Sequence, residues 1–171
     1  MESYMNRISN TGIVPVVKIL EKEDAYPLAK ALLNGGIDVI EVTYRSEHAT
    51  SAIQTISEQL PDMLVGAGTV LSVEQAKEAV EAGAKFIITP GFNTKVVQWC
   101  LDHDVEVYPG VSTASEVEMA LSMGLTQLKF FPAESSGGAK KLKDLSAPYA
   151  NVHFMPTGAP CLLYTSPSPR D

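Results

Sequence analysis

A lysine inside an apolar segment is the first residue of this sequence whose surroundings could support covalent chemistry. Lys129 lies between Leu128 and two phenylalanines, and Pro132 ends the segment, which is typical of a short buried strand. Burial disfavours the charged form of an amine, lowers its pKa and makes the neutral nitrogen available as a nucleophile. Such a lysine can form a Schiff base with a carbonyl substrate. The alternative is an edge-strand lysine that points into solvent, and Lys129 alone favours that alternative.

Three further polar residues lie at or just beyond the ends of two other predicted strands. Glu41 has the same strand parity as Val39 and Thr43, so all three should point to one face. A carboxylate inside a barrel needs a catalytic task or a cation. Arg45 can bind a substrate carboxylate through its bidentate guanidinium, and Thr69 can supply a hydroxyl to the same pocket. The alternatives are an ordinary ion pair between Glu41 and Arg45 and a strand-end cap at Thr69. Together with Lys129, the two charges favour a shared site.

The elements that would position these residues recur along the chain. Each of three alanine-rich helical segments ends at a glycine, which accepts the left-handed C-cap conformation, and leads into a short apolar strand. Strands that alternate with helices predict right-handed βαβ units and a parallel sheet. Helices are expected to begin at Ser46, Ser72, Asn93 and Thr113, which are residue types that cap helix N-termini. Seven strands are predicted, over residues 14–19, 39–43, 64–69, 86–89, 106–109, 128–131 and 152–155.

Polar residues and glycines gather where these strands end, at one edge of the expected sheet. In a (β/α)₈ TIM-type barrel this edge carries the active site. We prefer this α/β barrel to an open doubly wound sheet because the units are evenly spaced and no GxGxxG fingerprint follows the first strand. The barrel domain is expected over residues 1–158 and is incomplete, since an eighth βα unit is missing. Residues 159–171, with three prolines, are expected to be a non-native, disordered tail after a C-terminal truncation.

Six sequence blocks carry a specific resemblance to a known family. They are Glu-Val-Thr-Tyr-Arg (41–45), Val-Gly-Ala-Gly-Thr-Val (65–70), Ile-Thr-Pro-Gly (88–91), Pro-Gly-Val-Ser-Thr (109–113), Lys-Phe-Phe-Pro-Ala-Glu (129–134) and Met-Pro-Thr-Gly (155–158). In this order they resemble the 2-dehydro-3-deoxy-6-phosphogluconate aldolase family, also described as 4-hydroxy-2-oxoglutarate aldolases. The resemblance runs from about Gly12 to Gly158.

The resemblance implies a class I aldolase on a (β/α)₈ barrel, usually a homotrimer, that needs no metal and no cofactor. Its substrate would be a small 2-keto acid with a pyruvate moiety. Cleavage would release pyruvate together with glyceraldehyde 3-phosphate or glyoxylate.

The same resemblance assigns roles to individual residues. Lys129 matches the lysine that forms the Schiff base with the pyruvate carbonyl, and Glu41 matches the general acid and base. Arg45 matches the residue that binds the pyruvate carboxylate. Further substrate-binding residues implied in this way are Thr69, Pro90, Phe131, Thr157 and Gly158.

The sequence departs from the family at the expected phosphate site. The family has two glycines after Pro-Thr, whereas here Gly158 is followed by Ala159 and Pro160, and proline has no N–H to offer a phosphate. We therefore expect impaired phosphate binding, open sheet edges and a chain of low stability or activity.

Composition excludes other classes of function. The net charge of −7 argues against nucleic-acid binding, no segment is long and apolar enough for a membrane helix, and residues 1–10 do not form a signal peptide. Cys100 and Cys161 are isolated thiols, which indicates a cytoplasmic, reducing compartment. The three histidines have no metal-ligand spacing, so a zinc aldolase is not expected. Two alternatives stay open: a metal-free sugar-phosphate isomerase or epimerase with Glu41 as base, and an inactive fragment that associates with full-length homologues.

Overall fold

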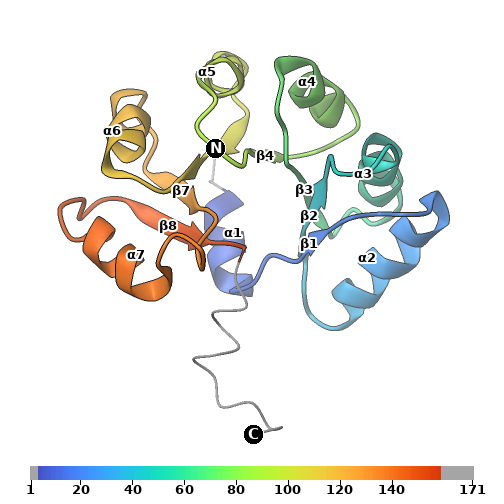
Figure 1. The fold of residues 1–171 in the computed structure, drawn as a ribbon. Coiled ribbons are helices and arrows are strands. Elements are labelled where there is room, and N and C mark those ends of the chain that lie inside the picture. The colour runs from blue at the N-terminus through green and yellow to red at the C-terminus, as the bar shows by residue number, and fades with distance from the viewer. Residues whose placement is uncertain (1–3, 159–171) are drawn as a thin grey trace, which may run out of the picture. The chain divides into compact units, whose positions relative to one another are not determined.

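The structure is a computed structural model that describes residues 4–158, and Figure 1 shows the order of its elements. The predicted tail at 159–171, with Cys161, lies outside these residues. The strands are β1 (Val16–Val17), β2 (Val39–Thr43), β3 (Leu64–Gly68), β4 (Phe86–Ile88), β5 (Glu106–Tyr108), β6 (Gly110–Val111), β7 (Gln127–Phe130) and β8 (His153–Pro156). The helices are α1 (Tyr4–Thr11), η1 (Lys22–Asp24), α2 (Ala25–Asn34), α3 (Ala49–Gln59), α4 (Val73–Glu81), α5 (Thr94–Asp102), α6 (Ala114–Ser122) and α7 (Gly138–Ser146).

The described chain divides into two compact units. The first comprises residues 4–89 and 93–108, and the second comprises residues 90–92 and 109–158. Each unit contains one parallel sheet, and each is described by itself below. No helix within residues 4–158 is long and apolar enough to cross a lipid bilayer.

The sheet of the first unit has five parallel strands in the order β1-β2-β3-β4-β5. Helices α2 to α5 connect these strands and lie on one side of the sheet (Figure 1). Neighbours in the sheet are therefore also neighbours in the sequence, as in a barrel, whereas a doubly wound sheet reverses its order at a switch point. All residues of β2 and β3 are buried, and in their register Glu41 is level with Gly66 and Thr43 with Gly68.

The sheet of the second unit has three parallel strands in the order β6-β7-β8. Lys129 of β7 lies level with Gly110 of β6 and with Met155 of β8. The apolar core of this unit is formed by Val111, Val117, Ala120, Leu128 and Val152, with Phe92, Leu125, Leu145, Tyr149 and Phe154 packed against it.

Most of the predicted helix boundaries are confirmed. Thr113 forms a full capping box with Glu116, Ser72 accepts a hydrogen bond from the backbone N–H of Gln75, and Asn93 accepts from the first turn of α5. The glycines predicted to end three helices, Gly36, Gly83 and Gly124, have φ values of 83°, 107° and 79°. These are left-handed conformations that a residue with a Cβ atom rarely adopts.

Some predicted boundaries were wrong. Ser46 is not a helix cap, because α3 begins only at Ala49, after His48, and has no side-chain cap. The first predicted strand, residues 14–19, is reduced to Val16–Val17. Pro109, which has no N–H, separates β5 from β6, so that this strand region contributes to both sheets.

Helix α1 was not among the predicted elements, and side-chain contacts attach it to the first unit. Arg7 Nε donates to the carboxylate of Asp38 at 2.7 Å, and Thr11 Oγ1 donates to the same carboxylate at 2.5 Å. Arg7 also donates to the backbone carbonyl of Asp62. The helix is thus linked to the residue directly before β2 and to a residue two positions before β3.

Candidate active site

Glu41 occupies a buried position in the centre of β2, and β3 leaves space for it. The side chain is only 1% exposed. A Cβ atom on Gly68 would lie 2.5 Å from Glu41 Cδ, far inside van der Waals contact. A Cβ atom on Gly66 would overlap the ring of Phe86. The Gly-Ala-Gly segment of β3 therefore makes room for a carboxylate and an aromatic ring.

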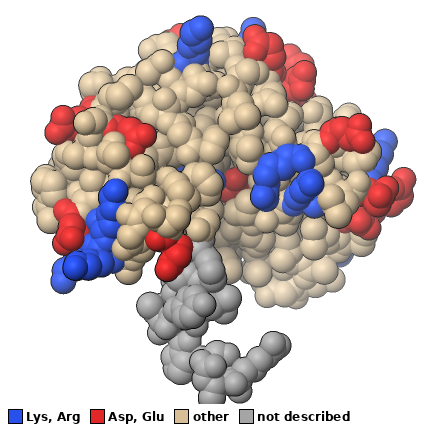
Figure 2. Space-filling model, viewed as in Figure 1, with Lys and Arg blue, Asp and Glu red and all other residues tan. Residues whose placement is uncertain are grey.

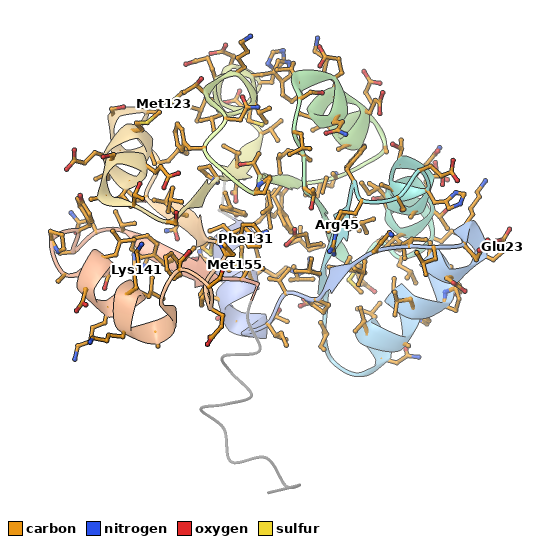
Figure 3. All side chains as sticks on the ribbon, viewed as in Figure 1. Glu23, Arg45, Met123, Phe131, Lys141 and Met155 are labelled. Carbon is orange, nitrogen blue, oxygen red and sulfur yellow. The ribbon has the colours of Figure 1, made fainter. Side chains whose placement is uncertain are left out.

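Arg45 lies two residues beyond the end of β2 and is labelled in Figure 3. Its Nε donates a hydrogen bond to Thr43 Oγ1 at 3.1 Å. The structure shows no ion pair between Arg45 and Glu41, although both residues belong to the described part of the first unit. The alternative of an ordinary Glu41–Arg45 ion pair is therefore wrong.

Thr69 follows the last residue of β3 and has an unusual backbone conformation. Its φ is 55°, a left-handed value that is rare for a β-branched residue and costs about 1–3 kcal/mol. A hydrogen bond of 2.8 Å from Tyr44 N to Gly68 O links the ends of β2 and β3. Arg45 and Thr69 therefore lie just beyond the ends of two paired strands, and Glu41 lies two residues before the end of β2.

Lys129 lies in the central strand of the second unit's sheet. It is 4% exposed, and its Nζ is 5.0 Å from the centroid of the Phe131 ring. The predicted burial of Lys129 is confirmed, and the solvent-exposed alternative is wrong. The ring face attracts an ammonium by about 0.5–2 kcal/mol, whereas desolvating an ammonium costs several kcal/mol. Burial and the ring face therefore act in opposite directions on the charge of this amine.

The backbone after β8 packs against Phe131, whose ring faces Lys129. Thr157 N donates to Phe130 O at 3.0 Å, and Thr157 O accepts from Ala133 N at 2.9 Å. Gly158 has a φ of 82°, and a Cβ atom there would lie 2.8 Å from Phe131 Cε2. Phe131, which follows the last residue of β7, and Met155 of β8 are labelled in Figure 3. Thr157 and Gly158 are thus placed beside the aromatic neighbour of Lys129.

Pro90 belongs to the second unit, together with Gly91 and Phe92. Its carbonyl lies so close to Gly110 that a Cβ atom on Gly110 would overlap it, and such an atom would also lie 2.9 Å from Gly91 N. Gly110 is level with Lys129 in the sheet. Pro90 is therefore next to the strand that borders Lys129.

The predicted site residues fall into two sets, one in each unit. The first unit holds Glu41, Arg45 and Thr69, and the second holds Pro90, Lys129, Phe131, Thr157 and Gly158. That both sets act on one substrate stays a prediction. Thr43 was missed as a candidate; its signal in the sequence is its position two residues from both Glu41 and Arg45.

The other reactive groups within residues 4–158 form no competing site. Cys100 is fully buried, and this burial raises the pKa of its thiol to about 12, so it acts as a small apolar residue. Within the described ranges, no group of three or more His, Cys, Asp or Glu side chains is arranged to hold a metal ion. On the face drawn in Figure 2, basic and acidic side chains are interspersed among uncharged residues.

Comparisons with known proteins agree with this geometry. Residues 4–162 match the sequence profile of the family described as KDPG and KHG aldolase. The 2-dehydro-3-deoxy-phosphogluconate aldolase of Treponema pallidum (strain Nichols) is 47% identical over 92% of this chain and 75% of the relative. The KHG/KDPG aldolase of Escherichia coli (strain K12) is 44% identical over 88% of this chain and 71% of the relative.

Solved structures show the same relationship. The KDPG aldolase of Legionella pneumophila, crystallised with pyruvate captured as a covalent carbinolamine intermediate, has a TM-score of 0.83 and 42% identity, covering 85% of this chain and 71% of that chain. The 2-keto-3-deoxy-6-phosphogluconate aldolase of Zymomonas mobilis ZM4 has a TM-score of 0.82 and 40% identity, covering 85% of this chain and 69% of that chain. The predicted TIM-barrel-like α/β class is confirmed, as is the predicted enzyme class, because aldolases are carbon–carbon lyases. This chain belongs to the KDPG and KHG aldolase family.

Proposed function

We propose that this chain is a class I aldolase that cleaves 2-dehydro-3-deoxy-6-phosphogluconate into pyruvate and glyceraldehyde 3-phosphate through a Schiff base on Lys129. The observation that carries this proposal is the burial of Lys129, 4% exposed, in the central strand of a parallel sheet. A lysine that is kept from water is a nucleophile at neutral pH when its amine is uncharged. The captured pyruvate carbinolamine of the Legionella relative supports the same covalent chemistry in the family.

The chemistry divides into five steps at Lys129. The amine adds to the C2 carbonyl of the substrate to form a carbinolamine, which loses water to give an iminium ion. The C4 hydroxyl then loses its proton as the C3–C4 bond breaks, and the bonding electron pair moves into the iminium to form an enamine. The aldehyde leaves, the enamine is protonated at C3, and water hydrolyses the resulting iminium to pyruvate and free Lys129.

The remaining roles rest on the resemblance to the family. Glu41 carries out the proton transfers as general acid and base. Arg45 binds the carboxylate next to the keto group, with the hydroxyls of Thr69 and Thr157 beside it. Pro90, Phe131 and Gly158 form the walls around the pyruvate moiety. Cleavage of 4-hydroxy-2-oxoglutarate to pyruvate and glyoxylate uses the same groups, because both substrates share this moiety.

Two properties of the protein in solution are part of the proposal. We infer a homotrimer, because the family resemblance implies one, and a cytoplasmic location, because the two cysteines lack the spacing of a disulfide framework. Light scattering coupled to size-exclusion chromatography measures the first of these directly. A monomer at micromolar concentration would contradict it.

Reductive trapping tests the covalent step. The purified chain is treated with pyruvate and borohydride, and the labelled residue is located by peptide mass spectrometry. We expect one reduced pyruvate on Lys129, no adduct in Lys129→Met, and an unchanged adduct in Lys140→Met, which removes an exposed lysine of α7. A folded chain that forms no adduct on Lys129 would overturn the proposal, and it would favour the isomerase or the inactive fragment. Pyruvate release from the phosphorylated substrate then tests the reaction itself.

A further inference from the structure

Thr43 joins Arg45 to the neighbouring strand through a single hydroxyl group. The residue is fully buried at the end of β2. Its Oγ1 donates to the backbone carbonyl of Val17 at 2.8 Å and accepts a hydrogen bond from Arg45 Nε at 3.1 Å. Val17 is the last residue of β1 and pairs with Val42 in the ladder. The guanidinium is thereby attached to a position that two paired strands hold in place.

The direction of both hydrogen bonds follows from their chemistry. Arginine has only N–H donors, so Thr43 Oγ1 must accept from Arg45 Nε. A backbone carbonyl only accepts, so the single hydroxyl hydrogen of Thr43 must point to Val17 O. One hydroxyl therefore satisfies both partners at once. Valine, which has the same shape, can do neither, whereas serine can do both.

The bond to Nε determines which part of the guanidinium can bind a substrate. A guanidinium offers a carboxylate either its side edge, with Nε and one Nη, or its end, with both Nη atoms. In Arg45 the Nε hydrogen is directed at Thr43. Arg45 makes no ion pair with any residue in the described part of the chain. The end with the two Nη atoms is therefore the edge that can form a bidentate pair.

We infer that Thr43 is a positioning residue, which orients the Arg45 guanidinium so that its two Nη atoms bind the substrate carboxylate end-on. The inference rests on the proposed function, since it requires Arg45 to bind the carboxylate of a 2-keto acid. Without the hydroxyl, Arg45 rotates among its many side-chain conformers, and ordering it on binding costs affinity. The chemistry at the keto carbon is not changed by this loss.

The test measures how much pyruvate half-saturates borohydride trapping, together with kcat and KM for aldol cleavage. In Thr43→Val we expect the half-saturating pyruvate concentration and KM to rise about tenfold, the equivalent of one hydrogen bond to a charged group, with a smaller change in kcat. Thr43→Ser should restore values close to those of the wild type. Circular dichroism and thermal unfolding verify the fold, and Thr43→Ala replaces Thr43→Val if the latter does not fold.

A double-mutant cycle separates positioning from a general structural role. In an Arg45→Met background, Thr43→Val should raise the half-saturating concentration no further, because the group it positions is gone. Equal effects of Thr43→Val in both backgrounds would overturn the inference. The inference would also be overturned if Thr43→Val formed the Lys129 adduct with the same half-saturating pyruvate concentration as the wild type. That result would leave the proposed function intact. A folded wild type that forms no adduct overturns the proposed function and the inference together.

Discussion

Gly68 lies directly against the carboxyl group of Glu41, so that a Cβ atom on Gly68 would be 2.5 Å from Glu41 Cδ. The two residues are 27 positions apart on adjacent strands, and the glycine has an ordinary backbone conformation. A glycine is therefore needed at position 68 because there is no space for a side chain, and not because of the backbone conformation. A buried carboxylate needs a neighbour this small because its position in the strand ladder leaves the side chain no other direction.

Replacing Gly68 with alanine should destabilise the protein. Overpacking a buried position costs about 1–3 kcal/mol of unfolding free energy, and Glu41 has to leave its present rotamer. Urea denaturation followed by circular dichroism measures the change. In a Glu41→Ala background most of the cost should disappear, because the colliding carboxylate is absent. An equal cost in both backgrounds would show that the glycine serves another purpose.

Glu41→Gln tests the carboxylate itself without changing its size. If Glu41 moves protons, kcat should fall by about 10²–10⁴-fold, the usual contribution of a general acid or base, while the fold is retained. Glu47→Gln is the matched control, because Glu47 lies on the same segment with its side chain 90% exposed. Steady-state kinetics measure kcat for both variants and for the wild type. A Glu41→Gln enzyme with wild-type kcat would remove Glu41 from the mechanism.

Thr69→Gly should make the protein more stable and a poorer catalyst. Glycine relieves the strain of the left-handed conformation at φ 55°, which costs threonine about 1–3 kcal/mol. This gain exceeds the roughly 0.5–1 kcal/mol that glycine costs through the extra backbone entropy it loses on folding. The variant also loses the hydroxyl proposed to bind the carboxylate, so KM should rise. Thermal unfolding and kinetics are measured on the same samples.

Asp104 offers the control for Thr69, since it has the same φ of 55° and lies in the exposed turn between α5 and β5. Asp104→Gly should give a smaller gain in stability, because aspartate tolerates this conformation better than threonine. Its KM should not change. A Thr69→Gly protein with a lowered unfolding temperature would mean that the threonine is not strained.

The attachment of α1 should weaken in acid. The hydrogen bond from Thr11, followed by the hydrogen bond and charge of Arg7, lowers the pKa of Asp38 below its usual 3.8. A carboxyl group whose pKa is lower in the folded state stabilises the fold fully above the unfolded value, and the contribution is lost as the pH falls through the folded value. The stability difference between the wild type and Asp38→Asn should therefore be constant near neutral pH.

Below about pH 3.8 this difference should shrink, which urea titrations at a series of pH values measure. Asp144→Asn, on the exposed side of α7, should show no such dependence. A difference that stays the same down to pH 2 or 3 would show that Asp38 acts through its shape and not its charge.

Local patterns in the sequence predicted most of the features that depend on neighbouring residues, such as strand bounds and helix caps. The strand Val39–Thr43 was predicted with its observed bounds, because this short segment is rich in the β-branched residues that favour a buried strand. The caps at Ser72, Asn93 and Thr113 depend on residues two or three positions away. The prediction of a cap at Ser46 failed because a serine caps a helix only if the helix begins directly after it.

The amino-acid sequence alone thus determined the alternation of elements, the apolar setting of Lys129 and the family, because these depend on neighbouring residues and on ordered motifs. Only the tertiary structure decided that Gly68 faces Glu41 and that Thr43 connects Arg45 to Val17. The period of a strand tells which face a side chain occupies, but the register between strands decides which residue it meets. That register is set by packing across the whole sheet, and it brings together residues that are 26 or 27 positions apart.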